Sequence, residues 1–349
     1  MKRAISLLLT FLLAGSLFAG CGKSAENEGK GTEEATSGEA VKEETPSKGT
    51  EKVTLRLADM SVYGIAIFNY AKKIGLLDNY FDDIGGYDIT VELSEWASGV
   101  AQNEAYAANE IDFSSMGNLP AVTGAVSGYG TKILAVNYLY DDEYFLVARE
   151  GSGIKTAADL KGRDVGTYVG TVQHYAIAKY LESAGLTIND VNLLNVAAET
   201  VTSLRNGDID AGTLENVIAH QLVESKDAYI ISEDQVPIYN YVVGREAFAK
   251  KYPEITVRVL QLINDTWAYA LEHKQDFIEF YSQVSGVELA VVQASYDKNF
   301  PVKSAKDFDE ADYKAYVDFV DWMKSVEYVG KDVNPDDLLD LTYVKQLKK

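Results

Sequence analysis

The 349-residue sequence has little cysteine, little histidine and little positive charge. Its single cysteine excludes a disulfide within the chain and the usual cysteine zinc sites. Three histidines without an HExxH pattern leave little for a histidine-based metal site, and we expect neither a metal nor a cofactor. Lys and Arg total 32 against 53 Asp and Glu, a formal charge of −21. Nucleic acid is therefore not an expected partner, because binding phosphates requires a basic surface.

Long hydrophobic runs are also missing, except for one near the N-terminus. Lys2 and Arg3 precede an apolar run, residues 4–18, whose helix would span about 22 Å of a ~30 Å hydrocarbon core. The run continues into Leu17-Phe18-Ala19-Gly20-Cys21, which resembles a bacterial lipobox, with Phe18 where Leu is usual. We expect residues 1–20 to be a lipoprotein signal peptide and Cys21 to carry a membrane-anchoring lipid, the alternative being an ordinary secretory signal.

The segment after this cysteine has almost nothing to bury. Residues 22–52 are mostly Gly, Ser, Thr, Glu, Lys and Ala. Such a composition cannot offset the entropy lost on ordering. We therefore expect residues 21–52 to be a disordered tether that displays the rest of the chain on the extracytoplasmic face, at the cell surface or in the periplasm.

Strand and helix patterns alternate through the remaining chain. Period-two or short apolar runs predict strands, and apolar residues at helical spacing predict helices. The alternation predicts an α/β fold with parallel sheets covered on both faces. Residues 245–349 are mostly helical in pattern. The expected strands are 53–58, 88–93, 111–113, 132–136, 144–148, 164–166, 191–194 and 209–211, and the expected helices include 63–76, 100–108, 172–184 and 200–205.

One motif occurs twice, at residues 107–112 (AANEID) and 204–210 (LRNGDID). Each predicts a helix end, a tight turn and a short strand. Asn118 and Asn216 each stand six residues beyond the final aspartate of their motif. Ligands of open α/β sheets bind beyond the carboxyl ends of strands, so we expect both asparagines to face one shared cleft.

These motifs belong to a wider resemblance over about residues 53–300. Ser98-Gly99, the 108–112 motif and Met116-Gly117-Asn118 resemble the first lobe of the nitrate/sulfonate/taurine substrate-binding family, whose relatives bind thiamin pyrimidine precursors. Residues 158–162 (ADLKG), 166–171 and 208–211 resemble its second lobe. The resemblance implies a periplasmic binding protein fold of type II, with two α/β lobes that close over a ligand. Its lobes would be residues 53–143 with 239–349, and residues 144–238.

The resemblance also implies a function. The chain would be the substrate-binding lipoprotein of an ABC transporter. It would be a monomer that captures a small nitrogen- or sulfur-containing solute (a sulfonate or taurine, nitrate, or a pyrimidine-like ring) and delivers it to a permease and its ATPase. The sequence contains no GxSxG elbow, no Walker A loop and no GxGxxG after a strand, so we expect no enzyme. Two alternatives stay open: an enzyme of pyrimidine or thiamin-precursor metabolism on the same fold, and a ligand sensor for a membrane receptor.

Two expected helix starts can hold part of the ligand. Thr171 is a candidate N-cap, and Gly170 allows close backbone approach. The free N–H groups at the start of that helix, at Val172 and beyond, would point into the cleft. Ser98 and Gly99 repeat the arrangement, and Gly117 precedes Asn118 in the first-lobe motif. A cap that faces only water is the alternative in each case.

Aromatic and acidic residues complete the predicted site. Tyr63, Gly64, Trp96 and Tyr168 follow strands and can contact the body of a ligand, while Tyr140 and Tyr144 are weaker candidates. His174 could donate a hydrogen bond from the first helical turn. Glu215, beside Asn216, would repel a small dianion, so we expect a ligand that is neutral, zwitterionic or cationic overall. Core aromatics and a solvated acid are the alternatives.

Overall fold

The computed structural model describes residues 50–60, 66–140, 144–232, 236, 238–298 and 309–347. All belong to one unit of the chain, Lys48–Lys349, whereas Met1–Ser47 form another. The predicted signal peptide, Cys21, most of the tether, Tyr63 and Gly64 lie outside the described residues, as does the side chain of Tyr140.

Within the described residues, ten strands form two five-stranded sheets. The first sheet has the order β2-β1-β3-β10-β4 and the second β7-β6-β8-β5-β9. The strands of the first sheet are β1 (Glu51–Met60), β2 (Tyr87–Trp96), β3 (Phe113–Gly117), β4 (Thr131–Tyr140) and β10 (Ile238–Arg245). Those of the second are β5 (Tyr144–Arg149), β6 (Asp164–Thr167), β7 (Asn192–Asn195), β8 (Ala211–Glu215) and β9 (Ala228–Ser232).

The two sheets share one strand pattern. In each sheet the first three strands in the order run parallel, and the fourth runs antiparallel to both of its neighbours. The prediction of parallel sheets is therefore wrong for β10 and β5. Each reversed strand enters its sheet directly after a strand of the other sheet.

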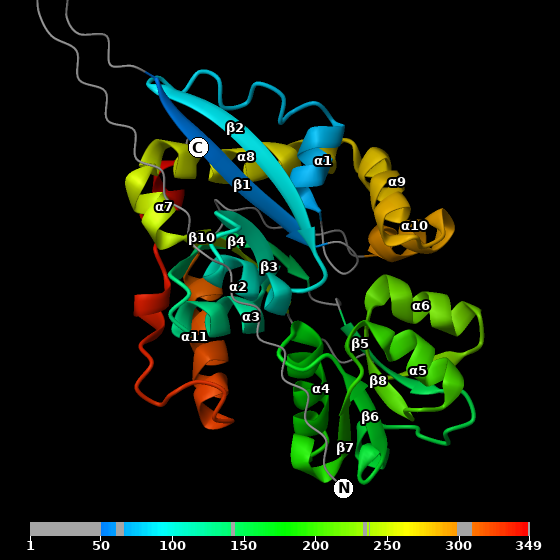
Figure 1. The fold of residues 1–349 in the computed structure, drawn as a ribbon. Coiled ribbons are helices and arrows are strands. Elements are labelled where there is room, and N and C mark those ends of the chain that lie inside the picture. Colours follow the sequence, from blue (N-terminus) through cyan, green and yellow to red (C-terminus); the bar gives the residue numbers. More distant parts are fainter. Residues whose placement is uncertain are drawn as a thin grey trace, which may run out of the picture. The chain divides into compact units, whose positions relative to one another are not determined.

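Helices cover both faces of both sheets (Figure 1). In β10, Val242 packs toward α1, α8 and α9, whereas Tyr241 and Val243 pack toward α2, α3 and α11. In β5, Leu146 packs toward α4, and Val147 toward α5 and α6. This alternation is the period-two pattern of a strand buried on both sides. The helices of the N-terminal part are α1 (Ile67–Lys73), α2 (Gly99–Ala107) and α3 (Asn118–Val126); α4 (Val172–Ser183), α5 (Thr200–Asn206) and α6 (Asn216–Glu224) follow in the middle.

The last third of the described chain is mostly helical, as its pattern predicted. Pro253 stands at the first position of α8, where its missing N–H costs nothing. Asp309 and Asp312 form a capping box that begins α11. The helices are α7 (Glu246–Lys251), α8 (Pro253–Glu272), α9 (Lys274–Ser285), α10 (Leu289–Lys298) and α11 (Glu310–Ser325).

The repeated motif occupies equivalent places in the two sheets. Asn109 and Gly207 both have left-handed backbone, with φ of 59° and 79°, and each precedes an aspartate by three residues. Asp112 pairs with Arg56 and Arg245, and Asp210 with Arg149 and Arg163. The strands that follow, β3 and β8, begin at Phe113 and Ala211, two residues later than predicted. The ion-paired aspartates Asp112 and Asp210 are the residues directly before these strands.

Candidate functional site

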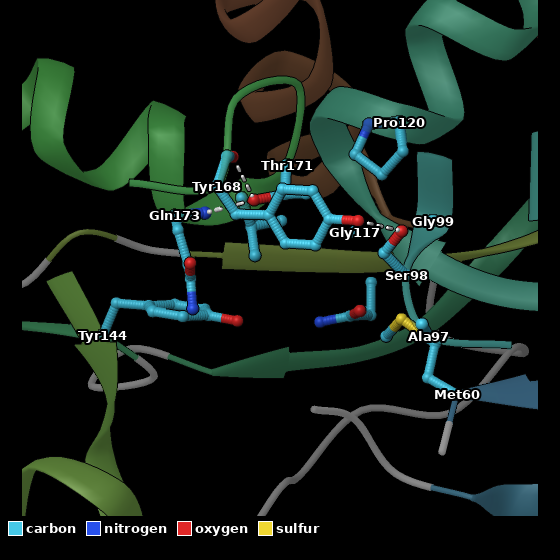
Figure 2. Close-up of a pocket in the computed structure, with 12 residues that line it drawn as sticks. Met60, Ala97, Ser98, Gly99, Gly117, Pro120, Tyr144, Tyr168, Thr171 and Gln173 are labelled. Carbon is cyan, nitrogen blue, oxygen red and sulfur yellow. Dashed lines mark hydrogen bonds between the residues drawn. The ribbon is translucent and has the colours of Figure 1, made fainter. Parts of the chain in front are cut away.

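A pocket opens where the carboxyl ends of β1, β2 and β3 meet the segment around the start of α4 (Figure 2). The cavity volume open to water-sized molecules is about 40 Å³, which is small beside typical ligand sites. Both sheets and their helices contribute to its wall. The lining residues are Met60, Ala97, Ser98, Gly99, Gly117, Pro120, Tyr144, Tyr168, Thr171, Val172, Gln173 and Asn240.

Three helices begin at this wall: α2 after Ser98, α3 after Gly117 and α4 after Thr171. The Ser98 Oγ accepts a hydrogen bond from the Ala101 N–H at 3.2 Å, and the Thr171 Oγ1 accepts one from the Gln173 N–H at 3.3 Å. Both predicted N-caps are therefore present. The first N–H groups of an α-helix have no acceptor within the helix, so three sets of donors are available beside the pocket.

The segment before α4 is held by its own hydrogen bonds. The Thr171 hydroxyl donates to the Tyr168 carbonyl oxygen at 2.7 Å, and Gly170 has a φ of 83°, which favours glycine. Tyr168 extends across the pocket, and its hydroxyl lies 3.1 Å from Ser98 Oγ in a hydrogen bond (Figure 2). This bond joins the helix start that follows the first sheet's β2 to the loop that follows the second sheet's β6.

The residues that line the pocket include no Asp, Glu, Lys, Arg or His among those described. A negatively charged group would therefore meet hydroxyl groups and helix N-terminal N–H groups, as in helix-based anion sites. Met60, Ala97 and Pro120 add apolar surface. The pocket can hold an anionic head together with a short apolar body.

Asn240 and the side chain of Gln173 are polar parts of the lining that were not predicted from the sequence; for Gln173 only the backbone N–H was expected to face the cleft. Gln173 is 4% exposed, and its Oε1 has no hydrogen-bond partner within the described part of the chain. Asn240 is 2% exposed and stands in β10 between Tyr239 and Tyr241. An amide within an otherwise apolar and aromatic strand was the available signal for Asn240. For Gln173 the available signal was its position in the first turn of the helix that Thr171 caps.

Seven of the predicted site residues line this pocket: Ser98, Gly99, Gly117, Tyr144, Tyr168, Thr171 and Val172. Six others are described but are not among its lining residues: Trp96, Asn118, Gly170, His174, Glu215 and Asn216. Trp96 Nε1 donates to Ser94 Oγ at 3.0 Å. The Asn118 Oδ1 accepts from the Leu119 N–H at 2.9 Å.

His174 packs away from the pocket against the chain that follows α11. The Tyr328 hydroxyl lies 2.6 Å from His174 Nε2, and the two rings meet edge to face. Burial lowers the pKa of His174, which favours the neutral ring. The next residue of α4, Tyr175, contacts Phe319 and Trp322 of α11. His174 therefore belongs to an aromatic contact between α4 and α11.

Glu215 and Asn216 contact the C-terminal helices. The Tyr281 hydroxyl on α9 donates to Glu215 Oε1, and the Ser295 hydroxyl on α10 donates to Asn216 Oδ1 at 2.6 Å. Glu215 is 8% exposed, and burial raises its pKa to about 7. The prediction about ligand charge assumed that Glu215 shares the ligand's space, but its carboxyl group is engaged with α9.

A family model described as NMT1/THI5 like matches residues 76–276, more than half of the chain. The chain belongs to the NMT1/THI5-like family. The matched range begins before β2 and ends in α9, so it includes every pocket residue except Met60.

Relatives of this NMT1/THI5-like chain include a protein of Bacillus subtilis strain 168 provisionally named an aliphatic sulfonates-binding protein. The two are 24% identical over 280 residues, which cover 79% of this chain and 83% of the relative. The alkanesulfonate-binding protein SsuA of Xanthomonas axonopodis pv. citri, solved bound to MOPS, superposes with a TM-score of 0.72 at 18% identity, covering 84% of this chain and 99% of that one. These proteins share the periplasmic binding protein fold.

The same fold also carries an enzyme. The desulfurization enzyme DSZB superposes with a TM-score of 0.58 at 16% identity, covering 84% of this chain and 97% of that one. Among the described residues, no group of three or more His, Cys, Asp or Glu side chains is arranged to hold a metal ion. Within the same ranges, no helix has both the length and the apolar character needed to cross a bilayer.

Proposed function

We propose that this chain is the solute-binding component of an ABC importer and captures a small organic anion of the alkanesulfonate type. The observation that carries the proposal is the pocket wall, which combines the N-termini of α2, α3 and α4 with hydroxyl groups and no charged side chain. Backbone N–H groups and helix dipoles stabilise an oxyanion without a counter-charge. The relatives named for sulfonate binding support this ligand class.

The proposal changes the expected ligand charge. A neutral, zwitterionic or cationic solute was expected because Glu215 would repel a small dianion. Glu215 is hydrogen-bonded to Tyr281 and is not a lining residue, so that argument no longer applies to this pocket. A singly charged sulfonate with a short alkyl body suits the N–H groups and the apolar surface of Met60, Ala97 and Pro120.

The proposal also covers the two lobes of the protein and its attachment to the membrane. Residues 53–143 with 239–349 would form one lobe and residues 144–238 the other, since the two sheets draw their strands almost entirely from these ranges. The two lobes of one monomer would close over the solute. The closed protein would then deliver the solute to a permease and its ATPase. Residues 1–20 would be a signal peptide, and a lipid on Cys21 would hold the protein at the extracytoplasmic face.

Isothermal titration calorimetry with a matched pair of ligands tests the ligand class. Propane-1-sulfonate and neutral propane-1-sulfonamide have similar size and shape but differ in charge. We expect the sulfonate to bind about 100-fold more tightly, because hydrogen bonds to a charged group contribute about 1.5–3 kcal/mol each. Equal binding of the two, or binding of neither, would contradict the proposal.

The enzyme alternative is tested with the same solution. Incubation of the protein with propane-1-sulfonate, followed by NMR of the solute, should return the sulfonate unchanged. Release of sulfite or another product would show turnover and favour the enzyme found on this fold.

A further inference from the structure

The segment Tyr168–Val172 meets the first-sheet side of the pocket at three points. The Tyr168 hydroxyl bonds Ser98 Oγ at 3.1 Å. A Cβ built on Gly170 would lie 3.4 Å from Val100 Cγ2, ordinary van der Waals contact. A Cβ built on Gly117 would lie 2.0 Å from Val172 Cγ1, a separation that real Cβ atoms essentially never show. The Val172 side chain therefore occupies the space that any other residue at position 117 would need.

The backbone at Gly117 does not itself require glycine. Its φ of −65° and ψ of 166° lie in the extended region that every residue adopts. The missing side chain therefore serves close approach and not an unusual conformation. Because valine is stiff at χ1, Val172 cannot easily turn its methyl group away from a new Cβ.

Gly99 offers a contrast within the same pocket. A Cβ there would lie 2.5 Å from Pro120 Cγ, and its next neighbours are also in Pro120 and Met116. These groups all belong to β3 and α3, on the same side of the pocket as Gly99. Crowding at Gly99 therefore disturbs the packing of α2 on α3, whereas crowding at Gly117 disturbs the contact between the two sides.

We infer that Val172 against Gly117 is the closing contact of the pocket, the point at which its two sides meet. The inference rests on the proposed function, because it assumes that two lobes close over a solute. Gly117 makes the approach possible, and Val172 fills the space that a side chain at position 117 would need.

Disulfide trapping tests the closing contact without any solute. The full chain with Cys21→Ser carries Val100→Cys and Gly170→Cys, which come together only in the closed arrangement. The strain of a cysteine at the positive φ of position 170 is the same in every variant and cancels in the comparison. Adding Gly117→Ala should slow disulfide formation at least tenfold, and adding Val172→Ala as well should restore most of the rate.

Gly99→Ala is the matched control. It should lower the melting temperature, measured by circular dichroism, while folded protein still forms the disulfide at the parental rate. Gly117→Ala should keep its melting temperature, because in an open chain its methyl group projects into an empty pocket. Parental trapping in the Gly117→Ala variant, or no rescue by Val172→Ala, would overturn the closing contact.

Solute binding gives a second readout. Val172→Ala should weaken propane-1-sulfonate in calorimetry, because the closed arrangement loses its contact with Gly117. Unchanged affinity would overturn the closing contact. If trapping behaves as expected but propane-1-sulfonate does not bind the parent, the closing contact stands and the proposed ligand class fails.

Discussion

Glu215 provides a quantitative test of the structure. Its carboxyl group is buried at the start of α6, where one oxygen accepts a hydrogen bond from Tyr281 and the other, Oε2, has no partner in the described part of the chain. Burial penalises the charged form more than this single bond favours it, and the pKa rises from 4.5 to about 7. The substitution Glu215→Gln keeps an acceptor for Tyr281 and removes the charge.

The sign of the effect follows from proton linkage. Between about pH 4.5 and pH 7 the folded protein holds a proton on Glu215 that the unfolded chain has lost. Its contribution to stability is therefore complete below pH 4.5 and is lost as pH rises through 7. The shift of about 2.5 pH units corresponds to about 3 kcal/mol of unfolding free energy. Glutamine is neutral throughout, so the variant should escape this loss.

Urea unfolding at pH 5 and pH 8 measures the effect. We expect the free energy of unfolding of Glu215→Gln relative to the parent to rise between these pH values by roughly 1–3 kcal/mol. Asp59, whose pKa burial also raises to about 7, is present in both chains and cancels in the difference. Glu104→Gln, at an exposed position of α2, is the control and should show no such change. Equal pH dependence in the parent and Glu215→Gln would refute the burial argument.

Three further predictions concern other contacts. Asp112→Ala should lower the free energy of unfolding by about 3 kcal/mol in urea titrations, since it leaves two arginines without their buried partner; equal stability would contradict the structural role. Asn216→Ala should lower stability by about 1 kcal/mol through the lost Ser295 bond and change propane-1-sulfonate affinity less than twofold; a larger loss of affinity would return Asn216 to the ligand site. Cys21→Ser should release the protein from the membrane fraction, and continued incorporation of labelled lipid would contradict the lipobox prediction.

Local sequence patterns predicted much of the fold because they reflect short-range physics. The two copies of the helix–turn–strand motif predicted equivalent turns at Asn109 and Gly207, and the structure confirms them. The caps at Ser98 and Thr171 were predicted from residue type and position alone. The aspartates of the motif proved to be partners of arginines on neighbouring strands, a role that depends on pairs up to 133 residues apart.

The pocket was predictable only in part, because its wall depends on where distant elements meet. Equivalent positions after β3 and β8 suggested that Asn118 and Asn216 share one cleft. The structure instead places Asn216 beside Ser295, some eighty positions later, and Asn118 against its own helix. Asn240 lines the pocket because β10 pairs with β3, which sets Asn240 opposite Gly117. No local pattern contains that register.

The reversed strands explain why the pocket draws on both sheets. β5 begins four residues after the end of β4 in the first sheet, and Tyr144, its first residue, lines the pocket. β10 returns the chain to the first sheet, and Asn240, near its start, lines the pocket as well. Both lining residues therefore stand where the chain passes between sheets, the positions that move least when two lobes rotate about their connections.

The Tyr168–Val172 segment follows β6, inside the second sheet, and contacts the first-sheet side through Ser98 and Gly117. Under the proposed closure, Val172 and Tyr168 would move toward Tyr144 and Asn240, and the side chains that meet there would set which solute fits.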